Sequence, residues 1–200
     1  MTRRLILCLI NFYGNMAATQ SKMIPLGTEA PYFNLFDPKA KRYFSLNDFK
    51  DGKPLLVMFI CNHCPYVMHI IHKLVEVSTE YIKKGINIVA INPNDFTAYP
   101  EDSPDKMIEY ANKFHYPFPY LIDETQEVAR NYDATCTPDF FLFDKDLKLA
   151  YRGQFDDSRP GNNITPTGKD LSYAMDCLLS NKPIDLEQKP SLGCSIKWKS

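Results

Sequence analysis

The chain has 200 residues, a formal net charge of −1 and 44% hydrophobic residues. This length and apolar content suit one domain whose core is large enough to fold without a disulfide scaffold. The near-neutral charge, with no basic stripe, argues against a nucleic-acid partner, because phosphate binding depends on clustered lysine and arginine.

The N-terminal segment has the composition of a secretory signal. Two arginines precede a short, mostly apolar run that ends in small residues. Met23 is a second candidate start, so we interpret residues 1–22 as a leader, a tail or a mis-called start, and residues 23–200 as one domain with an irregular C-terminal tail. The protein is then expected in the cytoplasm if Met23 is the real start, and exported if residues 1–22 act as a signal peptide. No run of about 18 apolar residues occurs, so a stable membrane span is not expected.

The first predicted elements are strands. YFNLF (residues 32–36) and KRYFSL (41–46) flank the turn-prone DPKA, which predicts an N-terminal β-hairpin. LLVMFI (55–60) is a continuous apolar run of strand length, as expected for a strand buried on both faces of a sheet.

A long helix follows this strand. Apolar residues recur at helical spacing from about Cys64 to Lys83. Gly85 comes directly after this pattern and suits a C-cap, because glycine adopts the left-handed conformation without strain.

The rest of the chain continues the alternation of strands and helices. Further strands are predicted at INIVAIN (86–92), YLID (120–123), DFFLFD (139–144) and KLAYRG (148–153), and helices at SPDKMIEYANKFHY (103–116), TQEVARNYD (125–133) and TGKDLSYAMDCLLSNK (167–182). Interleaved strands and helices predict an α/β fold whose sheet is covered by helices on both faces.

Cysteine spacing carries the strongest chemical signal. The six cysteines are Cys8, Cys61, Cys64, Cys136, Cys177 and Cys194. They are too few and too scattered for a disulfide scaffold in a chain of this size, and one close pair suggests redox or metal chemistry instead.

The close pair lies in CNHC, where the strand ends and the helix begins. Cys61 is expected at the N-terminus of the helix, whose dipole and free N–H groups favour a thiolate and lower its pKa. His63 can add positive charge or a hydrogen bond to the same sulfur. Cys64 is within disulfide reach of Cys61, so we predict that Cys61 attacks and Cys64 resolves. A copper or zinc site using both thiols and a histidine, or inert packing, are the alternatives.

The order of strand, CxxC, helix and a later Thr-Pro before a strand (CTPDFFLFD, 136–144) resembles the thioredoxin superfamily. In that superfamily the proline is cis and packs against the active disulfide, which assigns this role to Pro138. The resemblance implies a thioredoxin-like fold, with a central mixed β-sheet and helices on both faces.

Residues from about Leu26 to Lys199 are similar to thioredoxin-like proteins of the AhpC/TSA (redoxin) class that carry CNHCPYV, YRGQFDDSRPGN and a GCxIKW tail. This resemblance implies a thiol–disulfide oxidoreductase acting on protein or small-molecule thiols, recycled by a separate reductant. It implies no organic cofactor and no resident metal, because the Cys61–Cys64 disulfide itself carries the electrons.

Two departures from related families bear on the chemistry. Peroxiredoxins place a threonine three residues before the peroxidatic cysteine, and here Met58 occupies that place before Cys61. A peroxiredoxin-like thiol peroxidase is therefore the alternative function. Thioredoxin has a buried aspartate at the place of Leu55, so the proton carrier is open, with Glu80 and Asp139 as candidates.

Six further residues are predicted at the rim of the site. They are Asn62, Cys136, Thr137, Arg152, Asp157 and Arg159. Cys136 lies two residues before Pro138, and we predict that it is solvent-accessible and able to influence exchange. The arginines and Asp157 lie in a turn-rich segment. The alternative interpretation of this segment is a surface loop held by its own ion pairs.

The remaining histidines and cysteines have plainer interpretations. His69 and His72 are three residues apart on the long helix, and we interpret them as surface or packing residues rather than metal ligands. Cys177 is expected in the core. Cys194 is either part of a docked structural tail or a second resolving thiol, and we favour the structural tail.

Overall fold

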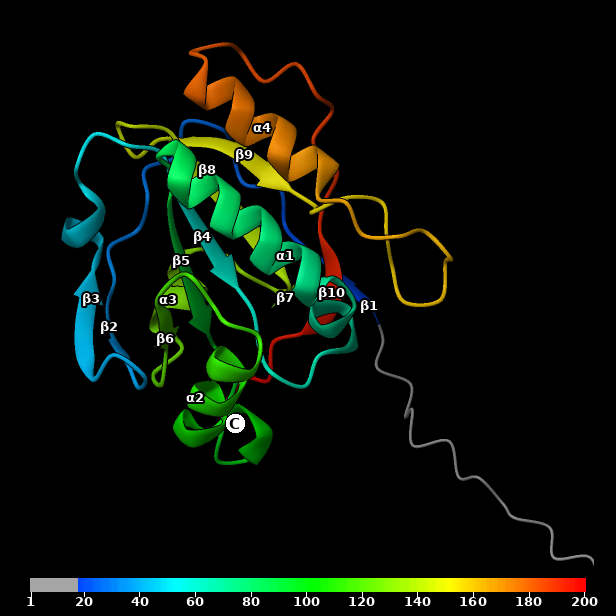
Figure 1. Ribbon diagram of the computed structural model, residues 1–200. Helices are drawn as coiled ribbons and strands as arrows, with labels where there is room; N and C mark the ends of the chain where they lie inside the picture. Colours follow the sequence, from blue (N-terminus) through cyan, green and yellow to red (C-terminus); the bar gives the residue numbers. More distant parts are fainter. Residues whose placement is uncertain (1–17) are drawn as a thin grey trace, which may run out of the picture.

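The structure is a computed structural model that describes residues 18–200 (Figure 1). Its main sheet has seven strands in the order β3-β2-β6-β5-β4-β8-β9. The strands are β2 (Asn34–Asp37), β3 (Arg42–Ser45), β4 (Leu55–Phe59), β5 (Asn87–Asn92), β6 (Tyr120–Ile122), β8 (Asp139–Phe143) and β9 (Leu149–Gly153).

The predicted mixed sheet is confirmed. β4 pairs in parallel with β5 and β5 with β6, whereas β8 is antiparallel to β4 and β9 is antiparallel to β8. The predicted hairpin is also present, because β2 and β3 pair in antiparallel register. β4, the predicted doubly buried strand, lies between β5 and β8 with all five residues buried.

Helices cover both faces of this sheet. They are α1 (Pro65–Lys84), α2 (Pro104–Lys113), α3 (Glu127–Asn131) and α4 (Lys169–Leu179). α1 and α4 lie side by side on one face, as Figure 1 shows, and α3 packs on the other. Alternate residues of β4 divide between the two cores: Met58 packs on the α1 side and Val57 on the α3 side.

Local sequence explains the limits of α1. Pro65 is its first residue, where a missing N–H costs little, so Cys64 becomes the N-cap. Gly85 ends the helix with φ of 103°, the left-handed conformation expected of a glycine C-cap. Among residues 18–200, we find no helix with the length and apolar character that crossing a membrane requires.

A second, three-stranded sheet was not predicted. It consists of β1 (Ala18–Gln20), β10 (Leu192–Ser195) and β7 (Cys136–Thr137), in the order β1-β10-β7. The described fold thus extends N-terminal to the predicted boundary at Met23, because β1 pairs with β10 and Ser21 hydrogen-bonds to Ser191, and residues 1–17 lie outside the described part. These strands are too short to show a pattern, and they pair with segments distant in the sequence.

Candidate active site

The CNHC segment connects β4 to α1. β4 ends at Phe59, and the residues from Cys61 to His63 form a turn before the helix begins. Cys64, rather than Cys61, is the N-cap, which corrects the predicted placement. The reason is Pro65, which is favoured at the first helical position and so sets the helix start one residue after Cys64.

The sulfur of Cys64 is surrounded by hydrogen-bond donors. Burial raises the pKa of this thiol, but hydrogen bonds from the thiols of Cys194 and Cys61 and from the backbone N–H of Val67 outweigh burial and lower the pKa to about 3. Val67 is the third helical residue, whose N–H an N-cap side chain normally accepts. Cys64 is therefore the thiol that the helix N-terminus stabilises as a thiolate.

Cys61 has the opposite tendency. Burial raises its pKa above the ordinary value, and so does its hydrogen bond to Cys64, because the neighbouring sulfur holds the negative charge. The predicted low pKa for Cys61 is therefore wrong. Its sulfur lies 3.2 Å from the hydroxyl oxygen of Thr137.

The predicted cis-proline is confirmed, because the Thr137–Pro138 peptide bond is cis. It brings Thr137 against both cysteines of the CNHC motif: the hydroxyl contacts Cys61, and the carbonyl oxygen is 3.0 Å from the sulfur of Cys64. That carbonyl can accept a hydrogen bond from a protonated Cys64. Thr137, predicted only as a rim residue, thus contacts both sulfurs.

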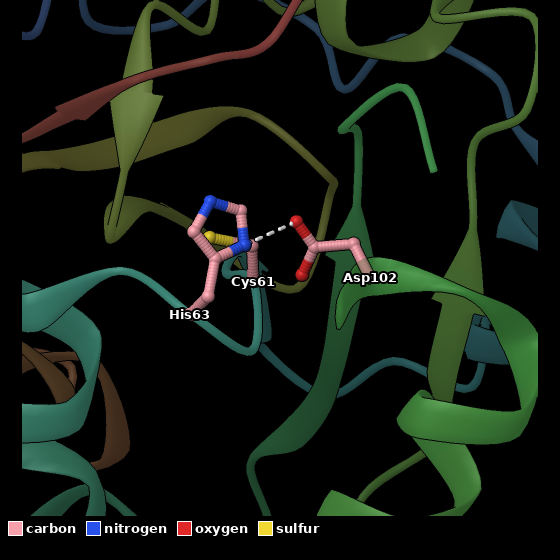
Figure 2. A group of neighbouring side chains, drawn as sticks. All are labelled: Cys61, His63 and Asp102. Carbon is pink, nitrogen blue, oxygen red and sulfur yellow. Dashed lines mark ion pairs between the residues drawn. The ribbon is translucent and has the colours of Figure 1, made fainter. Parts of the chain in front are cut away.

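A carboxylate that the sequence analysis missed completes the site. Asp102 is fully buried at the end of a 3₁₀ turn (Pro100–Asp102), and its Oδ2 lies 2.8 Å from Nδ1 of His63 (Figure 2). The backbone N–H of Asn62 donates to its Oδ1 at 2.8 Å, and the side chain of Asn94 donates to its Oδ2 at 2.7 Å. No sequence signal distinguished Asp102 from its acidic neighbours.

The ion pair with Asp102 sets the charge of His63. The contact with the carboxylate raises the pKa of His63, against the opposing effect of partial burial, and the charge on Cys64 raises it further. The ring also stacks on Tyr99, with centroids 5.9 Å apart and planes 4° from parallel. The cationic form of His63 is therefore favoured close to the pair.

The same residues form a candidate metal site. Ligand atoms of Cys61, His63 and Asp102 all lie within 4.8 Å of one another. In residues 18–200 this is the one group of three or more such side chains that meets this distance. It differs from the ligand set considered from the sequence, because Asp102 takes part and Cys64 does not.

Cys136 contradicts its prediction. Its side chain is completely buried rather than solvent-accessible, and burial raises its pKa. The reason is the C-terminal tail: β10 pairs with β7, with Ser195 opposite Cys136, and so covers this strand. The position of Cys136 in the sequence did not reveal that cover.

The three charged rim candidates occupy different places. Arg152 is fully buried and forms an ion pair with Asp139, which bridges β9 and β8. Asp157 pairs with Lys169 and Lys189 away from the cysteines. Arg159 alone shares a small hollow with Pro138, also lined by Tyr66, Ser158 and Leu192.

Neither candidate proton carrier lies free beside the pair. Glu80 is exposed and pairs with Lys84, and it is 16 residues along α1 from Cys64, which corresponds to about 24 Å. Asp139 is held by Arg152. The side chains of His63 and Asp102 both lie within 4.8 Å of the sulfur of Cys61, and they are paired with each other.

The other histidine and cysteine predictions have mixed outcomes. His72 packs edge-on against Phe114, and Cys177 is buried in α4, as expected. Cys194 lies in the docked tail, as favoured, but its sulfur is 2.6 Å from that of Cys64.

Comparisons with known proteins show the family of this chain. A model of the AhpC/TSA family matches residues 26–152. The thiol-disulfide oxidoreductase ResA of Geobacillus kaustophilus is 30% identical over 130 residues, which are 64% of this chain and 68% of that protein. Among solved structures, an uncharacterized conserved protein from Geobacillus kaustophilus is 54% identical, with a TM-score of 0.90, covering 92% of this chain and 97% of that chain.

A more distant structure supports the fold alone. A putative thiol:disulfide interchange protein DsbE from Chlorobium tepidum is 20% identical, with a TM-score of 0.61 over 78% of this chain and 99% of that chain. The thioredoxin-like fold predicted from the Thr-Pro and CxxC pattern is therefore confirmed.

Proposed function

Because the chain belongs to the AhpC/TSA family, we propose that it is a thiol–disulfide oxidoreductase whose electrons pass through Cys61 and Cys64. The observation that carries this proposal is the position of both thiols at the N-terminus of α1 beside the cis-proline, where Thr137 contacts both sulfurs and Cys64 is the preferred thiolate. The similarity to thiol-disulfide oxidoreductase ResA supports the same reaction class.

The two cysteines have different roles in this reaction. In the oxidised protein a substrate thiolate attacks the sulfur of Cys61, the Cys61–Cys64 bond breaks, and Cys64 leaves with the electron pair. A thiol of low pKa is a good leaving group, and the pKa of Cys64 is lowered to about 3. A second substrate thiolate then attacks the mixed disulfide, forms the substrate disulfide and releases Cys61.

The reverse direction uses the same asymmetry. Cys61 loses its proton and attacks a substrate disulfide, and the Cys64 thiolate then attacks the sulfur of Cys61 and releases the second substrate thiol. His63 is the residue placed to exchange protons with Cys61, since it is paired with Asp102 within 4.8 Å of that sulfur. Partners are therefore protein or small-molecule thiols and a reductant that recycles the pair.

A trapping experiment tests these roles. In Cys64→Ser the thiol that resolves a mixed disulfide at Cys61 is absent, so this variant should accumulate mixed disulfides, whereas Cys61→Ser should accumulate none with a substrate. Attached proteins are identified by mass spectrometry after non-reducing purification. Equal trapping by both variants would remove Cys61 from the role of attacking thiol.

A thiol peroxidase is the second candidate, since a thiolate of low pKa such as Cys64 is also what peroxide reduction requires. Stopped-flow mixing of the reduced protein with hydrogen peroxide separates the two. Fast oxidation that disappears in Cys64→Ser would favour the peroxidase, and slow oxidation with fast disulfide exchange would favour the oxidoreductase.

Elemental analysis of protein purified without chelator tests a metal at Cys61, His63 and Asp102.

A further inference from the structure

The tail strand β10 places a third thiol against the active pair. The sulfur of Cys194 lies 2.6 Å from the sulfur of Cys64, and both side chains are buried. This separation is roughly half an ångström longer than a disulfide bond of about 2.05 Å. Cys64 therefore has two thiol neighbours, because it is also hydrogen-bonded to Cys61.

The fold holds Cys194 in this place by several independent contacts. β10 pairs with β7 so that Cys194 lies opposite Thr137, and with β1 so that Cys194 lies opposite Ala18. Gly193 permits this approach: a Cβ at that position would lie 2.1 Å from the carbonyl oxygen of Thr137. Thr137 also contacts the sulfurs of Cys61 and Cys64, so one residue positions all three cysteines.

We propose that Cys194 is a third redox thiol, which exchanges with the Cys61–Cys64 disulfide to form a Cys64–Cys194 disulfide. This inference rests on the proposed function, which supplies the Cys61–Cys64 disulfide. The Cys194 thiolate attacks the sulfur of Cys64, the Cys64–Cys194 bond forms, and the Cys61–Cys64 bond breaks. Cys61 leaves with the electron pair and takes up the proton that Cys194 lost, so the step involves no net oxidation.

The charge on Cys64 differs between the reduced and the oxidised protein, and this difference changes the reactivity of Cys194. In the reduced protein the hydrogen bond to the Cys64 thiolate and burial both raise the pKa of Cys194, which keeps this thiol protonated. When Cys64 is part of a disulfide, it carries no negative charge, and that cause of the raised pKa is gone. Cys194 thus becomes a better nucleophile only after Cys64 has been oxidised.

The exchange has a consequence for the catalytic cycle. It frees Cys61 as a thiol while the protein remains oxidised by two electrons. Cys61 can then attack another substrate disulfide. The recycling reductant acts on the Cys64–Cys194 disulfide beside β10 rather than on the Cys61–Cys64 disulfide that reacts with substrate.

Disulfide mapping of the full chain tests this proposal. Reduced Cys61→Ser is treated with oxidised glutathione, quenched in acid, alkylated under denaturing conditions and digested for mass spectrometry. We expect a cross-linked peptide pair containing Cys64 and Cys194 in most molecules, formed within one chain. Cys61→Ser/Cys136→Ala is the matched control, since Cys136 is an equally buried cysteine on the adjacent strand, and it should give the same cross-link.

Two outcomes separate this inference from the proposed function. If Cys194 in Cys61→Ser stays fully alkylated while glutathione accumulates on Cys64, the third redox thiol is ruled out. Cys194→Ala, with the active pair intact, should form the Cys61–Cys64 disulfide. Failure of that disulfide to form in a folded Cys194→Ala would contradict the proposed function, whatever Cys61→Ser gives.

Discussion

At the scale of single residues, the site depends on the difference between two neighbouring cysteines. Cys64 caps α1 and accepts hydrogen bonds, so its pKa falls, whereas burial and the charge on Cys64 raise the pKa of Cys61. A stabilised thiolate stabilises the reduced form, which makes a disulfide more oxidising. His63 contributes to this stabilisation, because it and Cys64 interact as opposite charges.

The redox potential should respond to His63. We predict that His63→Pro makes the Cys61–Cys64 pair more reducing by about 30 mV, which corresponds to a tenfold change in the equilibrium constant. Equilibration with glutathione, followed by acid quenching and alkylation, measures the potential. His63→Ala distinguishes loss of the ring from an effect of proline on the backbone, and His72→Ala should leave the potential unchanged. A potential unchanged or more oxidising in both His63 variants would refute the role of His63.

Stability should depend on pH through the same ion pair. Asp102 raises the pKa of His63, so the pair stabilises the fold fully below the ordinary pKa of about 6.5, and this contribution disappears as pH rises through the raised value. His63→Gln keeps a neutral hydrogen-bonding group. We expect it to lower the free energy of unfolding by about 1 kcal/mol more at pH 5.5 than at pH 9.

Urea denaturation at the two pH values measures this difference. His72→Gln, which lacks a carboxylate partner in residues 18–200, is the control and should lower the free energy of unfolding equally at both. If His63→Gln also lowers the free energy of unfolding equally at both pH values, the ion pair does not contribute to stability.

At the scale of elements, the three-stranded sheet connects the two ends of the described chain to the active site. β1 pairs with β10, and β10 pairs with β7 next to the cis-proline. Ser21 adds backbone and side-chain hydrogen bonds to Ser191. Residues 18–22 thus support the strand that carries Cys194.

Truncation tests this contribution. A chain that begins at Met23 lacks β1, and we expect its free energy of unfolding to fall by about 1–3 kcal/mol relative to a chain that begins at Ala18, because several hydrogen bonds are lost. Chemical denaturation measures the stability, and hydrogen exchange of the β10 amides reports the local effect. Equal stability and equal exchange in the two chains would mean that β1 does not support β10.

At the scale of the whole molecule, a buried ion pair joins two strands of the main sheet. Arg152 on β9 and Asp139 on β8 are both completely buried and paired. The guanidinium also donates to the carbonyl oxygen of Phe140. This ion pair explains why Arg152, which was predicted at the rim of the site, lies in the interior of the protein.

Removing one partner of this ion pair should lower the free energy of unfolding far more than replacing both partners with apolar residues. We predict that Asp139→Asn lowers the free energy of unfolding by about 3–5 kcal/mol, because Arg152 is left buried without a countercharge, and that Asp139→Leu/Arg152→Met recovers most of this loss. Glu29→Gln, which breaks the exposed pair with Lys148, should leave the free energy of unfolding almost unchanged, because solvent screens that pair. A double variant as unstable as Asp139→Asn would contradict this account.

Sequence patterns alone determined the main elements and the chemical motif of this protein. The hairpin, β4 and α1 with its glycine C-cap follow from local residue types, because apolar periodicity and turn residues act over a few neighbouring positions. The cis-proline was predicted from the resemblance to the thioredoxin superfamily, and the structure confirms it. The CNHC motif also indicated the proposed redox pair without any knowledge of its surroundings.

Only the tertiary structure decided what surrounds that pair. Asp102 and Cys194 are 39 and 130 residues from the groups they contact, His63 and Cys64, and no local pattern reports such pairings. The short strands β1, β7 and β10 form only by pairing with one another, and their pairing both buries Cys136 and brings Cys194 to Cys64. The physical reason is that burial and proton sharing depend on which distant segments meet, and the pairing of the sheets decides this.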